Sequence, residues 1–147
     1  MDKDELTLRE RVAWLELRTL VDGLAPELLE QPGVNVEGWT VKDVLWHIAH
    51  WWDHLAGLLD EVRLGTFVEP TDDDAATDAE NARVLEDSRG MPLADVERGV
   101  DEARGRVLAA WQALPELTEP AERWFVWETI EHYEEHLPGI REAGGSG

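Results

Sequence analysis

Residues 38–51 read GWTVKDVLWHIAHW, and this stretch decides the fold that we predict. Thr40 has a hydroxyl that can cap a helix N-terminus, and Asp43 stands three residues later, at the second position of a capping box. Apolar residues then recur at helical spacing: Val44, Leu45, Ile48, Trp52, Leu55 and Leu59. The stretch therefore predicts a helix from about Val41 to Val62, with one side in a core and another beside a pocket.

The N-terminal segment predicts a second amphipathic helix, from Thr7 to Leu24. Its apolar residues recur near helical spacing, and we expect them to face the core: Leu8, Val12, Leu15, Leu20 and Leu24. The charged residues between them suit a solvated outer face.

Three more helices complete the prediction. They are a short one from about Ala75 to Ser88, a long one from Leu93 to Leu114 that Pro115 ends, and a final one from near Pro120 toward Pro138. Because no segment alternates like a strand, we predict an all-α fold, a four-helix bundle with the short helix as an extra between the second and third long helices. We expect one domain over residues 1–142, followed by a Gly/Ser-rich tail over 143–147 left over from cloning.

Charge and composition exclude several classes of protein. The chain carries 33 acidic and 13 basic residues, a net charge of -20, which would repel a nucleic-acid backbone. It has no cysteine, so any metal site must use His, Asp or Glu. No apolar run approaches the roughly 20 residues of a membrane span, and no signal peptide opens the chain. We therefore expect a cytoplasmic protein that binds neither nucleic acid nor membrane.

Two of the five histidines stand four residues apart in the final predicted helix. His132 and His136 thus share a face, and neighbouring helical turns can bring two imidazole nitrogens to one metal ion. Such a pair also arises by chance on surfaces, so the spacing alone leaves metal binding open.

His47 lies in the first quoted stretch, among tryptophans and aliphatic residues, where an unpaired polar ring would be costly to bury. It is either a core histidine with a hydrogen-bond partner or a metal ligand. His50 and His54 follow on roughly the same side of that helix, so a site made only from these three residues is also conceivable. That site would leave His132 and His136 unexplained.

Residues 38–51 resemble the second-helix signature of the DinB-like superfamily. Residues 130–141, which read IEHYEEHLPGIR, look like the closing segment of the same superfamily, in which two histidines four apart complete a metal triad. The tryptophan-rich end and the His-Tyr-x-x-His-Leu run are most similar to the ClbS/DfsB group.

This resemblance implies an up-down-down-up bundle in which His47 meets His132 and His136 at a pocket mouth. It implies a divalent metal ion as cofactor, zinc or nickel, with water in the remaining positions. His50 is then a residue of the pocket rather than a ligand. By helical angle Tyr133 faces away from the two C-terminal histidines, so we expect it to pack in the core or between subunits.

The resemblance also implies two kinds of function. The first is a metal-dependent enzyme, a hydrolase or a thiol-dependent transferase, that acts on a small electrophilic molecule. The second is a non-catalytic metal-bound bundle that sequesters a ligand or uses the ion structurally. DinB-like bundles often form dimers, so a homodimer is a further expectation.

Overall fold

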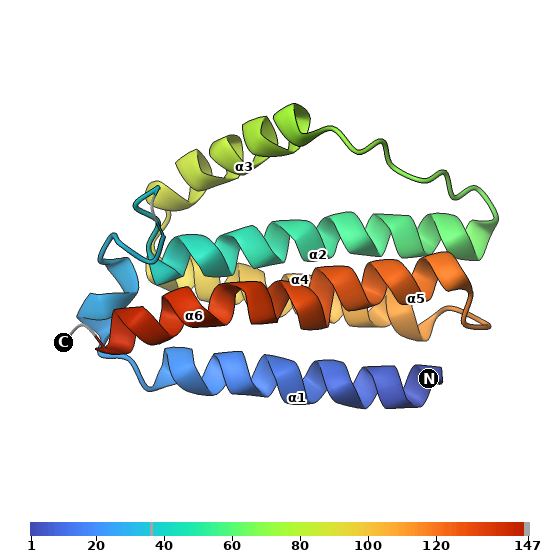
Figure 1. The fold of residues 1–147 in the computed structure, drawn as a ribbon, viewed down its shortest axis with the longest axis horizontal. Coiled ribbons are helices and arrows are strands. Elements are labelled where there is room, and N and C mark those ends of the chain that lie inside the picture. Colours follow the sequence, from blue (N-terminus) through green and yellow to red (C-terminus); the bar gives the residue numbers. More distant parts are fainter. Residues whose placement is uncertain (36, 146–147) are drawn as a thin grey trace. The chain divides into compact units, whose positions relative to one another are not determined.

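The computed structural model describes residues 1–35 and 37–145, and every regular element among them is a helix (Figure 1). The elements in chain order are α1 (Lys3–Asp22), the 3-10 turn η1 (Pro26–Glu30), α2 (Val41–Leu64), α3 (Asp74–Arg89), α4 (Leu93–Gln112), α5 (Glu119–Val126), the π-helical turn η2 (Trp127–Glu131) and α6 (His132–Gly145). The predicted all-α class is confirmed, and α3 is the extra helix expected after the second long one. Within the described residues, none of the helices combines the length and apolar character needed to cross a membrane.

The chain divides into two compact units, which we describe separately. The terminal unit consists of Met1–Val44 and Leu117–Gly147, and the central unit of Leu45–Glu116. The first turn of α2 therefore belongs to the terminal unit and the rest of this helix to the central unit.

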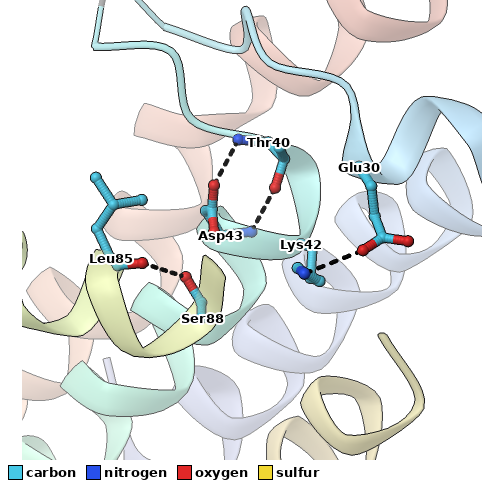
Figure 2. Close-up of polar contacts among 6 residues, drawn as sticks. All are labelled: Glu30, Thr40, Lys42, Asp43, Leu85 and Ser88. Carbon is cyan, nitrogen blue, oxygen red and sulfur yellow. Dashed lines mark hydrogen bonds and ion pairs between the residues drawn. The ribbon is translucent and has the colours of Figure 1, made fainter. Parts of the chain in front are cut away.

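The predicted start of α2 is confirmed by a reciprocal capping box (Figure 2). The Thr40 N–H donates to Asp43 Oδ2 at 2.9 Å, and the Asp43 N–H donates to Thr40 Oγ1 at 3.0 Å. Just beside it, Lys42 Nζ lies 3.0 Å from Glu30 Oε1 and ties η1 to the first turn of α2. Because two orphan N–H groups are satisfied here, the register of α2 is fixed from its first residue.

Helix α1 buries a different face from the one that we predicted. Its buried residues are Leu6, Glu10, Trp14, Leu17 and Val21. By contrast, Leu8, Val12 and Leu15 are 62%, 60% and 52% exposed, so their assignment to the core is wrong. The face that is buried contains Trp14, which removes more apolar surface from water than any residue of the exposed stripe.

A buried polar contact also favours the observed face of α1. The Tyr133 hydroxyl of α6 lies 2.9 Å from Glu10 Oε1, and both side chains are almost completely buried. The Tyr133 ring also packs on Trp14, with ring centroids 5.4 Å apart. Glu10 was overlooked in the sequence because an isolated carboxylate is rarely buried unless it has a partner. The expectation that Tyr133 packs in the core is confirmed.

Helix α6 continues past Pro138, where the sequence pattern predicted its end. An interior proline removes one helical hydrogen bond and costs about 3 kcal/mol. Contacts on both sides of Pro138 offset this cost: Leu137 and Ile140 are buried, and Arg141 forms a 2.9 Å ion pair with Glu16 of α1. Helices α1 and α6 accordingly lie side by side in the terminal unit (Figure 1). The helix ends at Gly145, within the predicted tail, whose last two residues, 146 and 147, lie outside the described part of the chain.

The apolar residues predicted for α2 are all buried, and all of them except Val44 belong to the central unit. Helix α3 buries only Val84 and Ser88. Two side-chain hydrogen bonds attach it to α2: His50 Nε2 lies 2.7 Å from Glu80 Oε1, and Trp51 Nε1 donates to Asn81 Oδ1 at 2.9 Å. Polar contacts rather than an apolar face therefore hold much of α3 in place.

Candidate metal centre

The terminal unit holds two of the predicted ligands in one compact arrangement. The His132 and His136 rings lie one helical turn apart on α6, with centroids 4.7 Å apart and planes inclined at 62°. His132 is 7% exposed and His136 is partly buried. The predicted pair is thus present on one helical face, in a setting from which water is largely excluded.

Directly before His132 the helix widens into the π-helical turn η2. Within this turn the Thr129 hydroxyl donates a 2.5 Å hydrogen bond to the Phe125 carbonyl, one turn back. Single π turns inside α-helices are uncommon and occur frequently at functional sites. The sequence pattern predicted a continuous α-helix here, because a threonine that bonds back to its own helix leaves no signature in apolar periodicity.

Burial determines the protonation state of the pair. It lowers the pKa of His132 to about 3, with His136 adding to this effect and the Glu128 backbone opposing it. It also lowers the pKa of His136 to about 4. Both rings are therefore neutral at pH 7, which is the form that binds a metal ion.

A third titratable group, Glu128, lies one turn before His132 and was not singled out in the sequence. Burial, and secondarily the charge of Glu135, raises its pKa to about 8. Its Oε2 atom is buried and has no hydrogen-bond partner among the described residues. The sequence could not single out Glu128, because the chain has 33 acidic residues and only the folded environment distinguishes a buried glutamate from a solvated one.

His47, the remaining predicted ligand, lies in the central unit on α2. It is 7% exposed, and the Trp51 ring lies near it at a centroid distance of 6.5 Å. That His47 completes a site with the two histidines of α6 stays a prediction.

His50 and His54 form a second pair on α2, with a different environment. His50 contacts Glu80 as described above, and the two residues are 28% and 34% exposed. Burial lowers the pKa of His54, but the charges of Glu80 and Glu61 act in the opposite direction. Carboxylates therefore act on both residues of this pair, and His50 attaches α3 to α2.

The terminal unit also has a surface hollow of about 370 Å³ around Trp127. The residues that line it are Glu119, Glu122, Arg123, Val126, Trp127 and Glu131. Trp127 is 51% exposed, unlike the buried tryptophans of the core. None of the three predicted metal ligands lines this hollow.

Comparison with known families identifies the chain. Residues 11–132 match the mycothiol maleylpyruvate isomerase N-terminal domain family. The chain belongs to this family. No curated protein and no solved structure matches the chain.

The mycothiol maleylpyruvate isomerase N-terminal domain family is DinB-like, so the predicted superfamily is confirmed. The likeness to the ClbS/DfsB group within it stays a prediction. The matched segment contains His47 and His132 and stops four residues before His136.

For a member of this DinB-like family, the donor set fits a divalent metal ion. His132 and His136, both in the terminal unit, can each offer one imidazole nitrogen to such an ion. The two rings of α6 need no deprotonation at neutral pH, since burial already keeps them neutral. Imidazoles suit zinc, nickel and copper better than magnesium or calcium, which prefer oxygen ligands.

Proposed function

We propose that this chain is a metal-dependent enzyme domain that uses a low-molecular-weight thiol to transform a small electrophilic molecule. The family match over residues 11–132 is the observation that carries this proposal. The family is named after mycothiol maleylpyruvate isomerase, and this name includes mycothiol, a low-molecular-weight thiol. We further propose that His47 joins His132 and His136 to bind one divalent cation, zinc or nickel.

The chemistry of the donor set supports this choice. Three neutral imidazoles leave a bound dication with its full charge, so it would lower the pKa of a thiol or water in an open coordination position. The chain contains no cysteine, so the thiol must come from a cosubstrate. In this proposal, side chains of the chain hold the metal and keep water away from it. The burial of His132 contributes to both of these roles.

The test of this proposed function uses the bound metal itself as a spectroscopic probe. We expect protein purified without chelator to contain one divalent ion per chain by elemental analysis. After cobalt substitution, mycothiol should produce a sulfur-to-metal charge-transfer absorption band, and the corresponding alcohol analogue should not. Maleylpyruvate is then the first substrate to assay, with and without the thiol.

The possible failures of this test have different meanings. Cobalt binding without a thiol-dependent band would contradict the thiol mechanism and leave activation of water, or a non-catalytic role in sequestering a ligand. The absence of stoichiometric metal would contradict the whole proposal.

A further inference from the structure

The hollow around Trp127 combines an exposed aromatic ring with carboxylates. All of its lining residues come from α5 and η2, and they follow one another at helical spacing within the terminal unit. Trp127 and Glu131 are the first and last residues of the π turn, and both are exposed. Because π turns occur frequently at functional sites, this face is a candidate binding site in its own right.

The Trp127 ring is held in place from one side. It stacks on the Trp124 ring, with centroids 5.0 Å apart and planes inclined at 22°. Trp124 is only 9% exposed, and the guanidinium carbon of Arg123 lies 6.0 Å from the centroid of its ring. Since Trp124 covers one face of the Trp127 ring, the 51% exposure of Trp127 comes from its other face and its edge.

The charges of the hollow leave a surplus of carboxylates. Arg123 Nε lies 2.8 Å from Glu119 Oε1, so these two charges compensate each other. Glu122 and Glu131 form no ion pair within the part of the chain that the structure describes. A ligand in the hollow therefore meets two uncompensated carboxylates beside an aromatic face, and that face also attracts positive charge.

This combination selects a weakly hydrated organic cation. A primary ammonium group is strongly hydrated, whereas a methylated one can place its methyl groups on an indole ring while the ring and the carboxylates attract its charge. The hollow of about 370 Å³ is at the lower end of the range for small-molecule pockets. An anion such as maleylpyruvate would be repelled by the two glutamates, so the hollow is distinct in chemistry from a site for the proposed substrate.

From the exposed ring and its flanking carboxylates we infer that the hollow binds a small organic cation with a methylated ammonium group. The ammonium group lies on the open face of Trp127, and Glu122 and Glu131 lie beside it. The site goes beyond the proposed enzymatic function and requires no metal ion.

Choline is the probe for this site, and dimethylbutanol, its neutral carbon isostere, is the control ligand. In NMR spectra of the full chain, the Trp127 indole N–H gives one of eight tryptophan signals, which its loss in Trp127→Phe identifies. We expect choline to shift this signal saturably and the isostere to bind about tenfold more weakly, because it has the same shape without the charge. Equal binding of the two ligands, or the same saturable shift with potassium chloride, would overturn the inference.

Paired glutamate variants separate the hollow from the general field of an acidic chain. Glu122→Gln/Glu131→Gln removes both uncompensated carboxylates and should weaken choline binding about fivefold. Glu27→Gln/Glu134→Gln is the matched control, because it removes two exposed carboxylates of the same unit that do not line the hollow. It should bind choline like the wild type. An equal loss in both variants would reduce the effect to non-specific attraction and contradict the site.

The role of the ring is tested by Trp127→Ala, with saturation transfer to the choline methyl protons as the measurement. We expect affinity to fall about fivefold, and Trp127→Phe to keep part of it, because phenylalanine offers a weaker aromatic face. Unchanged binding in Trp127→Ala would show that choline lies elsewhere. If the Trp127 signal of the wild type responds to protein concentration and not to choline, a second copy covers the ring and the inference is wrong.

Discussion

The two histidine pairs of this chain have the same spacing and opposite surroundings. His132 and His136 lie on α6 in the terminal unit, where burial lowers both pKa values far below neutrality. His50 and His54 lie on α2 in the central unit, where Glu80 contacts His50 and offsets part of the effect of burial on His54. A spacing of four residues permits a metal site, and we expect the environment to decide whether the imidazoles are available to an ion.

The largest expected effect separates the two pairs by metal affinity. We expect His132→Ala, His136→Ala and His47→Ala each to weaken zinc or nickel binding by about 200-fold. The estimate takes about 10 kcal/mol for a zinc site and divides it over three ligands, or roughly 3 kcal/mol for each. Isothermal titration calorimetry of the chelator-treated variants measures it.

The matched variants in the central unit are His50→Ala and His54→Ala, and both should bind metal like the wild type. At free metal one hundred times the dissociation constant, they should also keep the full stabilisation of about 2.7 kcal/mol. If His54→Ala lost the ion and His136→Ala kept it, a site built from α2 alone would be correct.

A second, smaller effect separates the pairs by their response to acid in the metal-free protein. A histidine whose pKa is lowered by folding contributes stability that is present above the unfolded value of about 6.5 and is lost as the pH falls. Between pH 6.5 and 5.5 we expect His132 and His136 together to cost about 2 kcal/mol of unfolding free energy.

Urea unfolding of the wild type and of a His132→Gln/His136→Gln variant, both with chelator, measures this loss as a difference. Glu128 acts in the opposite direction, because its raised pKa stabilises the fold as the pH falls from about 8 toward the unfolded carboxyl value. Its contribution cancels, since both proteins contain it. If the wild type and a His50→Gln/His54→Gln variant differed by the same loss of unfolding free energy, burial would not distinguish the two pairs.

The parts of the structure that could be predicted from sequence are those set by local chemistry. The capping box of Thr40 and Asp43 depends on two side chains three residues apart, and it starts α2 at the expected residue. The apolar periodicity of α2 was also sufficient to predict which of its residues are buried, because this helix has one dominant apolar face.

Features that depend on distant residues could not be predicted. Helix α1 has two apolar stripes, and the choice between them follows from Tyr133, more than a hundred residues away, which meets Glu10. The raised pKa of Glu128 likewise comes from its burial in the folded terminal unit, and the π turn that contains it leaves no signature in the apolar pattern. For the site, the three histidines could be predicted from the sequence. The neutral state of His132 and His136 follows only from their burial in the structure.

The smallest expected effect concerns the carboxylate that distinguishes the central pair. Glu80→Gln weakens a partly exposed contact between α3 and His50, so we expect a loss of only about 0.5 kcal/mol. Because α3 buries just two residues, this loss should appear as local opening, with amide hydrogen exchange in residues 74–89 about twofold faster. Glu86→Gln is the control on the same helix, since Glu86 is 75% exposed and its contact with Arg89 is 3.7 Å long. Metal affinity should stay unchanged in both variants, because a carboxylate that docks α3 is not needed by the pair on α6. A Glu80→Gln variant that lost its metal would instead place the ion in the central unit, and the comparison between the two pairs would be reversed.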